Sequence, residues 1–242
     1  MSADRSGPCA AIVVAAGAGV RMGSAMPKAL MPVAGRALAA WCLDALVDSG
    51  RIDRIVIVAP PDREPEMAHA LGLDLTQVVT GGASRADSVG RGLAAIGDGA
   101  EFVLVHDAAR PLVDPALIAA VIDGVGDCDG AIAAAPLADT PKRVGEDLVI
   151  HETLLRAGLW LAQTPQVFRR DALERAFAQA RAEERLDLAT DCASMVEQVG
   201  GRVAVVASMR PNLKVTTPAD IHMAELLLAD AHRVTSANVI DR

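Results

Sequence analysis

The sequence predicts an α/β fold in which a mostly parallel sheet carries helices on both faces. Short apolar runs rich in β-branched residues alternate with longer stretches whose apolar residues recur at helical spacing. Runs such as RIVIVA at 54–59 are apolar throughout, which is typical of parallel strands buried on both faces. The 242 residues include no Ser/Gly linker and no internal repeat, so we expect one domain over residues 1–242.

Each element follows from its local pattern along the chain. The β-branched runs predict strands over residues 10–14, 54–59, 77–80, 101–106, 130–135 and 202–207. The helical spacing predicts helices over residues 38–48, 64–71, 115–125, 171–184, 192–199 and 218–231, and one that opens at Ser84 or Asp87 and runs to about residue 96. Thr217 lies near the N-cap of the last helix, and the tail over about 232–242 is expected to fray.

One connection is longer and more mixed than the others. The stretch over about 137–156 holds Pro141, Gly145 and two short β-like patches, so we predict a projecting β-hairpin arm. An arm that projects from a compact domain usually needs a partner to bury it. We therefore expect contact between two copies of the chain there, with a plain surface excursion as the alternative.

Composition argues against several functional classes. Lys plus Arg is 23 and Asp plus Glu is 31, so the net charge is −8, and an acidic chain without a long basic run does not suit non-specific nucleic-acid binding. No apolar stretch reaches the ~18 residues of a membrane helix, so we expect no membrane partner. The cysteines, Cys9, Cys42, Cys128 and Cys192, lie far apart without a CxxC pair, which favours free thiols in a reducing cytoplasm over a disulfide framework or a zinc site.

The loop after the first strand, AAGAGVRMGSAMPKAL at 15–30, has the most informative pattern. Three glycines let the backbone approach a ligand and expose its N–H donors. Their spacing, G-x-G-x-x-x-G, is one residue longer than the dinucleotide fingerprint, and the Walker A pattern is absent. Because Arg21 and Lys28 place two cations inside this segment, we interpret it as a phosphate loop of another kind.

Three further loops follow strands, where ligands bind in open α/β sheets. Two glycines at 81–82 before a Ser/Asp-rich helix start suit contact with an anion or a base edge, although an ordinary N-capped helix entry has the same pattern. Asp107 ends a central strand and could hold Mg²⁺ near a triphosphate, with Arg110 on a second phosphate; a surface ion pair is the alternative. Lys214 precedes a Thr-Thr-Pro helix start that could itself bind an anion.

Seven motifs together resemble one known family. In order they are AAGAGVRMGSAMPKAL, GGASRADSV, VHDAARP, DTPKRV, AQTPQVF, TDCAS and LKVTTPAD. They resemble the 2-C-methyl-D-erythritol 4-phosphate cytidylyltransferases of the non-mevalonate isoprenoid pathway, over about residues 10–228. The resemblance implies a Rossmann-like nucleotidyltransferase domain, a homodimer joined through the arm, and CTP and Mg²⁺ as ligands. The chain departs from the family pattern at Cys192, where an acidic residue is usual, at Pro141 and at Val13.

The resemblance also assigns roles to residues that match the family's motifs. The residues expected to act on the reacting phosphates are Arg21, Lys28, Lys214 and Arg156. The residues expected to bind the nucleotide are Ala15, Ala16, Gly17, Gly19, Gly82, Ser88 and Asp107. The residues expected around methylerythritol phosphate are Asp107, Arg110, Thr140, Arg156, Thr164 and Thr190, with Thr140 and Arg156 supplied by the partner's arm. Asp107 is the expected metal ligand.

The implied reaction joins methylerythritol phosphate to the CMP part of CTP and releases pyrophosphate. The nucleophile is a phosphate monoester with a second pKa of about 6, so it is mostly dianionic at pH 7 and needs no general base. This fits a sequence without a Ser/His/Asp or Cys/His constellation. A ribitol 5-phosphate cytidylyltransferase and a catalytically silent nucleotide-binding homologue remain alternatives. A nicotinamide dehydrogenase is disfavoured by the glycine spacing and by the non-acidic end of the second strand, Ala59-Pro60-Pro61.

Overall fold

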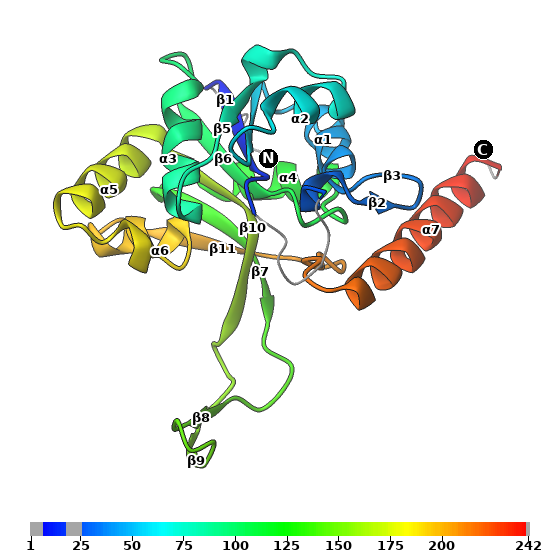
Figure 1. Ribbon diagram of the computed structural model, residues 1–242. Helices are drawn as coiled ribbons and strands as arrows, with labels where there is room; N and C mark the ends of the chain where they lie inside the picture. Colours follow the sequence, from blue (N-terminus) through cyan, green and yellow to red (C-terminus); the bar gives the residue numbers. More distant parts are fainter. Residues whose placement is uncertain (1–6, 18–25, 241–242) are drawn as a thin grey trace.

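The computed structural model of the protein describes residues 7–17 and 26–240. Its centre is a sheet that helices flank (Figure 1), and this sheet has seven strands in the order β11-β7-β10-β6-β1-β4-β5. The strands are β1 (Cys9–Val14), β4 (Arg54–Ala59), β5 (Val78–Thr80), β6 (Phe102–Asp107), β7 (Gly130–Pro136), β10 (Trp160–Arg169) and β11 (Val203–Ala207). All neighbouring pairs are parallel except those of β10, which runs antiparallel to both β6 and β7. The predicted α/β class with a mostly parallel sheet is confirmed.

Helices cover both faces of the sheet, also as predicted (Figure 1). One face carries α1 (Leu38–Asp48), α2 (Glu64–Leu71) and α4 (Pro115–Asp123), and the other carries α3 (Arg85–Ala95), α5 (Arg170–Ala182) and α6 (Cys192–Gln198). Successive residues of a strand point to opposite faces, so Ala11 and Val13 of β1 pack under the first group while Ala10 and Ile12 pack under the second. Burial of one Val or Ile side chain stabilises the folded state by about 1.5–3 kcal/mol relative to leaving that side chain exposed. The continuous apolar runs therefore reflect burial on both sides.

The main difference from the predicted elements is β10 (Trp160–Arg169). Its run contains Pro165 and four polar side chains, a pattern that argues against a central strand because proline cannot donate to the ladder. The structure accommodates Pro165 at a register shift between Ala162 and Gln166 in the pairing with β7. The small hairpin of β2 (Pro32–Val33) and β3 (Arg36–Ala37) and the 3₁₀ helices η2 (Lys28–Leu30), η3 (Leu75–Gln77) and η4 (Leu186–Leu188) were also not predicted.

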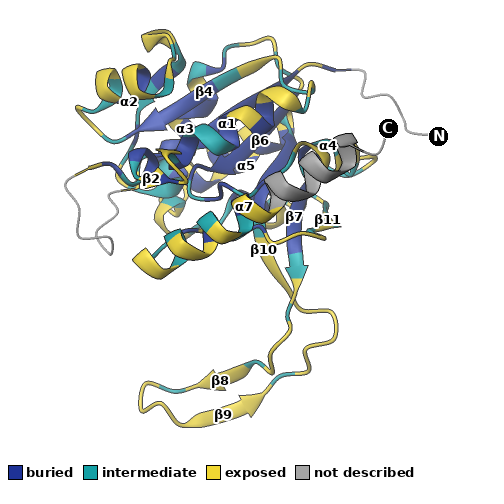
Figure 2. Ribbon diagram, turned by 90° about the vertical axis from the view of Figure 1, so that its right-hand side faces the viewer, coloured by how far each residue is buried: buried dark blue, intermediate teal, exposed yellow. Residues whose placement is uncertain are grey.

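The predicted arm is present and projects well beyond the body of the molecule (Figure 2). Its tip is an antiparallel hairpin of β8 (Lys142–Val144) and β9 (Ile150–Thr153), and its stem continues from β7 and β10. Every residue of β8 and β9 is exposed. Pro141 does not prevent the pairing, because its carbonyl accepts a hydrogen bond from the N–H of Leu154 at 3.1 Å and the ladder begins at the next residue.

The last helix, α7 (Pro218–Ile240), is longer than the sequence predicted. We expected it to end near residue 231 and the tail beyond to fray, but the helix runs on to Ile240. After Pro218 the chain contains neither glycine nor proline, so no residue interrupts the helix there. Ala224 and Leu228 anchor α7 against a small cluster that includes Leu38 and Val215. Within the described residues, no helix is both long and apolar enough to cross a membrane.

Candidate active site

A cavity of about 480 Å³ opens at the carboxyl ends of β1, β4, β5 and β6. The loops that follow these strands supply the lining, as the position of ligand sites in open α/β sheets predicts. The described residues that line it are Val14, Ala15, Ala16, Gly17, Lys28, Ala29, Leu38, Pro61, Gly82, Ala83, Ser84, Arg85, Ser88, Asp107, Ala108, Ala109 and Lys214. Three cations and one carboxylate lie among them, so this part of an acidic chain is locally positive and suits an anion.

The backbone of two loops forms one wall of the cavity. Ala15 donates its N–H to the Val58 carbonyl at 2.9 Å, and Gly81 donates to the Ala59 carbonyl at 2.7 Å, so both loops are fixed to β4. A Cβ at Gly81 would lie 2.4 Å from the Cβ of Ala16, so only glycine allows the loops to approach this closely. The glycines thus bring backbone from two strand ends together beside the cavity.

The turn into α3 is tightly hydrogen-bonded. Ser84 is its N-cap and accepts from the N–H of Asp87 at 3.1 Å, which confirms Ser84 as the start of this helix. The Ser88 hydroxyl accepts from the N–H of Gly82 at 3.0 Å. A Cβ at Gly82 would lie 1.8 Å from a carboxylate oxygen of Asp87, so a side chain here would displace the Asp87 carboxylate. The two alternatives for this motif are therefore both present, because the same residues form an ordinary N-capped helix entry and line the cavity.

Two of the chain's three lysines line the cavity. Lys28 begins the short helix η2, and Lys214 lies in the loop that leads to α7. Val215 donates its N–H to the Ala109 carbonyl at 2.8 Å, which ties the Lys214 loop to the loop after β6. Asp220 accepts from the N–H groups of Thr216 and Thr217 at 2.7 and 2.8 Å. The sequence separates the two lysines widely, and the fold brings them to one space.

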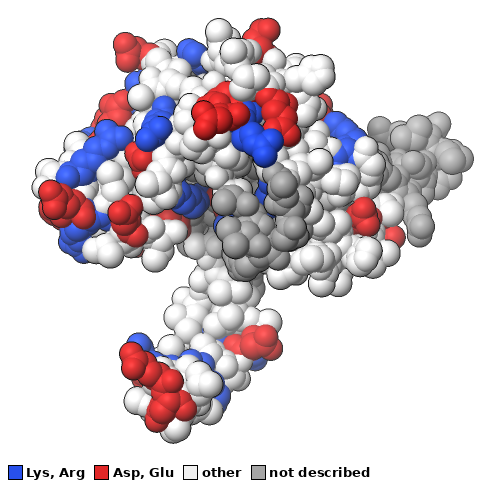
Figure 3. Space-filling model, viewed as in Figure 1, with Lys and Arg blue, Asp and Glu red and all other residues white. Residues whose placement is uncertain are grey.

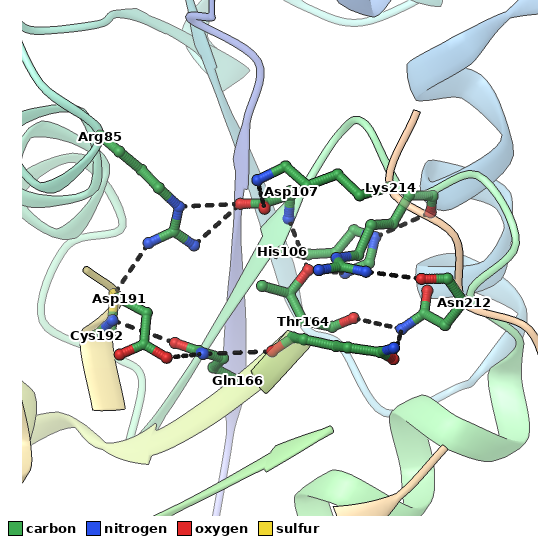
Figure 4. Close-up of polar contacts among 11 residues, drawn as sticks. Arg85, His106, Asp107, Thr164, Gln166, Asp191, Cys192, Asn212 and Lys214 are labelled. Atoms are coloured by element: carbon green, nitrogen blue, oxygen red, sulfur yellow. Dashed lines mark hydrogen bonds and ion pairs between the residues drawn. The ribbon is translucent and has the colours of Figure 1, made fainter. Parts of the chain in front are cut away.

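The only carboxylate among the described lining residues, Asp107, holds two cations (Figure 4). Its Oδ1 accepts from Arg85 Nε at 3.0 Å and lies 2.9 Å from Arg85 Nη2, while its Oδ2 lies 2.7 Å from Lys214 Nζ. Burial opposes ionisation of this carboxyl, but Arg85 and Lys214 together hold its pKa well below the usual range. Asp107 is therefore ionised at neutral pH.

A buried chain of hydrogen bonds supports Asp107 from behind. The Asp107 N–H donates to Thr164 Oγ1 at 3.0 Å, and this hydroxyl lies 3.1 Å from His106 Nδ1. The Arg110 carbonyl lies 3.3 Å from His106 Nε2 and can only accept, so Nε2 carries the hydrogen, and Nδ1 of the neutral ring accepts from the Thr164 hydroxyl. Burial lowers the pKa of His106 to about 4, so the ring is neutral and structural.

Arg110 lies beneath the cavity and is not among its lining residues. Its side chain is buried, and Nη1 donates to the Asn212 carbonyl at 2.7 Å. Asn212 Nδ2 donates in turn to the Thr164 carbonyl at 2.8 Å. Among the described residues, Arg110 Nε and Asn212 Oδ1 are the buried side-chain atoms without a partner. Arg110 and Thr164, both expected near methylerythritol phosphate, thus sit in the layer behind Asp107.

Three other expected residues lie away from the cavity in a single chain. Thr140 and Arg156 are exposed on the arm, where Arg156 donates to the Ala138 carbonyl. Thr190 is exposed ahead of α6 and donates to the Ser194 hydroxyl at 3.2 Å. Arg21 and Gly19 lie outside the described residues.

Sequence reasoning missed Arg85. In the motif GGASRADSV it has the appearance of a solvated helix charge. One signal could have identified it. Arg85 directly follows the N-cap of α3, where the positive end of the helix dipole disfavours a cation, so its presence there needs a carboxylate such as Asp107 to offset the cost.

In the part of the chain that the structure describes, a glycine-rich wall, three cations and one carboxylate meet at the carboxyl edge of a doubly covered, mostly parallel sheet, an arrangement typical of nucleotide-binding α/β proteins. The family model for 2-C-methyl-D-erythritol 4-phosphate cytidylyltransferase matches residues 9–230, and the chain belongs to this enzyme family.

Relatives agree in sequence and in structure. The chain is 44% identical to the 2-C-methyl-D-erythritol 4-phosphate cytidylyltransferase of Ralstonia nicotianae, with 91% of this chain and 92% of the relative covered. The enzyme of the same description from Frankia casuarinae is 45% identical, with 91% and 81% covered. The crystal structure of the Thermus thermophilus enzyme superposes with a TM-score of 0.75 at 32% identity and covers 90% of this chain and 98% of that one.

Proposed function

We propose that the protein transfers the cytidylyl group of CTP to 2-C-methyl-D-erythritol 4-phosphate and releases pyrophosphate, a step of isoprenoid precursor biosynthesis. The observation that carries the proposal is the meeting of Lys28 and Lys214 with two glycine loops around one cavity. Membership of the cytidylyltransferase family supports the choice of both substrates. The product is 4-diphosphocytidyl-2-C-methyl-D-erythritol.

The chemistry requires placement of charge and no proton transfer. A phosphate oxygen of the substrate forms a bond to the α-phosphorus of CTP, and the bond from that phosphorus to the α,β-bridging oxygen breaks, so that pyrophosphate leaves. The attacking phosphate is already mostly dianionic at pH 7. The barrier lies in bringing two anions together and in the charge that develops at phosphorus. Lys28 and Lys214 would stabilise that charge, and we propose the same role for Arg21, which lies outside the described residues.

The two glycine loops of the cavity wall would divide the nucleotide between them. We assign the triphosphate to the loop of Ala15, Ala16 and Gly17, because Lys28 lines the same cavity, and we keep the same role for Gly19, which lies outside the described residues. The cytosine is assigned to the loop of Gly82 and Ser88, whose hydrogen bond fixes an amide and a hydroxyl side by side. Asp107 lines the same cavity, and we assign it to the ribose.

Asp107 is also the residue that would hold Mg²⁺. Among the described residues no three His, Cys, Asp or Glu side chains gather around one point, and Asp107 is the carboxylate that these residues offer to the cavity. Mg²⁺ is usually held by one or two carboxylates together with substrate phosphates, and a single Asp at a triphosphate site fits that pattern. When bound, Mg²⁺ would neutralise charge on the phosphates.

The second substrate would be bound between two copies of the chain. The arm exposes large apolar side chains, including Leu148 and Leu155 at 83% and 88%, and a solvent-facing apolar surface of this kind favours burial by a partner. Figure 3 shows that charged side chains of both signs gather at the tip of the arm. In a homodimer, Thr140 and Arg156 would meet the partner's cavity near Arg110, Thr164 and Thr190.

The four cysteines are free, which suits a reducing cytoplasm.

The test is purified protein with CTP, Mg²⁺ and a panel of sugar phosphates, with pyrophosphate release as the measurement. We expect turnover with methylerythritol phosphate and much less with ribitol 5-phosphate. Preference for ribitol 5-phosphate would reassign the substrate. Binding of CTP with no turnover on any member of the panel would indicate a silent nucleotide-binding homologue.

A further inference from the structure

Each oxygen of Asp107 is paired with a different cation, and the two cations are held very differently (Figure 4). Arg85 contacts Asp107 through Nε and Nη2, and both of these atoms face Oδ1. Lys214 contacts Oδ2 alone, through Nζ at 2.7 Å. This arrangement leaves Oδ2 as the oxygen that Lys214 can release when an anion enters the cavity.

Arg85 is fixed at both ends of its guanidinium. While Nε and Nη2 face Asp107, Nη1 contacts the buried Sγ of Cys192 at 3.8 Å. Its side chain is 27% exposed, against 42% for Lys214. A planar guanidinium with contacts on two sides keeps its direction, whereas an ammonium on a four-carbon stem can turn. Lys214 is therefore the cation that can move to a phosphate.

Movement of Lys214 would be costly if Asp107 had no other partner. The carboxylate is 9% exposed, and removal of one partner from a buried ion pair leaves an uncompensated charge. Arg85 remains on Oδ1 and compensates that charge. We propose that Arg85 is a positioning residue, which holds Asp107 in place and compensated so that Lys214 can transfer to the phosphates of the nucleotide. The proposal rests on the proposed function for the identity of that nucleotide.

A double-mutant cycle tests whether Arg85 acts through Asp107. Arg85→Met is made in the natural protein and in Asp107→Asn, and CTP affinity is measured by calorimetry and the rate of one turnover by rapid quench. We expect Arg85→Met to lower the single-turnover rate at least tenfold in the natural background and less than about twofold in Asp107→Asn, because residues that share a partner are not additive. Equal factors in the two backgrounds would overturn the proposal.

Two further variants complete the design. Arg91→Met removes an exposed cation from the same helix, whose contact is with Asp87, and we expect no loss of rate. Arg85→Lys retains a cation but loses the two-donor contact. It is measured in the same two backgrounds, the natural protein and Asp107→Asn, so the test can still be made if Arg85→Met does not fold. We expect a smaller loss for Arg85→Lys, again confined to the background that contains Asp107. An equal loss in Asp107→Asn would contradict the proposal here too.

The outcome is separable from the proposed function. Absence of turnover in the natural protein with CTP and methylerythritol phosphate would refute the function, and the cycle would then be read from CTP affinity alone. Normal turnover in the natural protein, with additive losses in the cycle, would refute only the role of Arg85.

Discussion

Lys28 stands at the start of a three-residue helix and reaches the cavity beside the first glycine loop. We predict that Lys28→Ala folds normally but lowers the rate of pyrophosphate release about 10²–10³-fold, since the loss of one preorganised donor to a developing charge has this effect. Steady-state kinetics and thermal unfolding monitored by circular dichroism measure the two properties. Arg185→Ala, which removes an exposed cation outside the cavity lining, serves as the control. An unchanged kcat would remove Lys28 from the mechanism.

For Arg156 we predict an effect on the second substrate, because this residue lies on the arm and is not among the lining residues of the cavity. We expect Arg156→Ala to raise the KM for methylerythritol phosphate at least tenfold and to leave CTP affinity within about twofold, as a charged hydrogen bond to a phosphate contributes about 1.5–3 kcal/mol. Substrate titrations and calorimetry with CTP distinguish the two effects. Equal losses for both substrates would show that Arg156 does not act on the second substrate.

Among single residues, the sequence predicted best the charged side chains that directly follow the carboxyl end of a strand. Lys28 and Lys214 were predicted as phosphate ligands and Asp107 as the metal ligand near them, and the structure brings all three to one cavity. The layer behind the cavity could not be predicted in the same way. Contacts such as Asp107 to Thr164 depend on β10, whose place beside β6 no local pattern reveals.

Among the elements, the start of α7 controls the Lys214 loop through Asp220. Hydrogen bonds from Thr216 and Thr217 lower the pKa of Asp220 to about 2. A carboxyl with a depressed pKa stabilises the folded state above its ordinary pKa of about 3.9 and loses this contribution as pH falls toward the folded value. We predict that Asp220→Ala is about 1 kcal/mol less stable than the natural protein at pH 6, as for other helix caps, and that the deficit shrinks at pH 3.

Urea unfolding at the two pH values, followed by fluorescence or circular dichroism, provides this measurement. A deficit that stays constant from pH 6 to pH 3 would mean that the charge of Asp220 does not stabilise the loop. Because Lys214 lies in the same loop, the variant should also release pyrophosphate more slowly at pH 7.

The arm is the second element with a separable role. Leu137 donates its N–H to the Leu159 carbonyl at 3.0 Å, so the chain can be closed at this point without loss of the sheet. We predict that replacing residues 138–158 with a short Asn-Gly turn keeps CTP affinity but abolishes dimerisation and lowers turnover at least a hundredfold. Light scattering after size exclusion reports the mass, and a variant that remains dimeric would show that the arm is not the dimer contact.

Elements buried on both faces were the easiest to predict, because their composition alone shows their environment. The strands β1, β4 and β6 and the helices α1 and α2 lie where the pattern placed them, with ends that differ by one residue or none. Prediction failed for β10, where Pro165 and polar side chains concealed a central strand, and for β2 and β3, which are too short to show a period. Tertiary packing decides those segments.

On the scale of the whole molecule, the strand order explains why one edge can carry the reaction. The strands β6, β1, β4 and β5 are adjacent, so their carboxyl ends supply a single cavity. The neighbouring strands β10 and β7 continue past the same edge as the stem of the arm (Figure 1). A net charge of −8 would repel phosphates from much of the surface, which makes the local cluster of cations more important for binding.

The central claim is that Lys28 and Lys214 meet around one triphosphate. A crystal structure of the protein with CTP and Mg²⁺ tests it most directly. We predict that both ammonium groups lie within about 2.7–3.2 Å of phosphate oxygens of the same CTP, with Lys214 moved from Asp107 and Arg85 still on Oδ1. A triphosphate bound outside this cavity, or one contacted by neither lysine, would contradict the account.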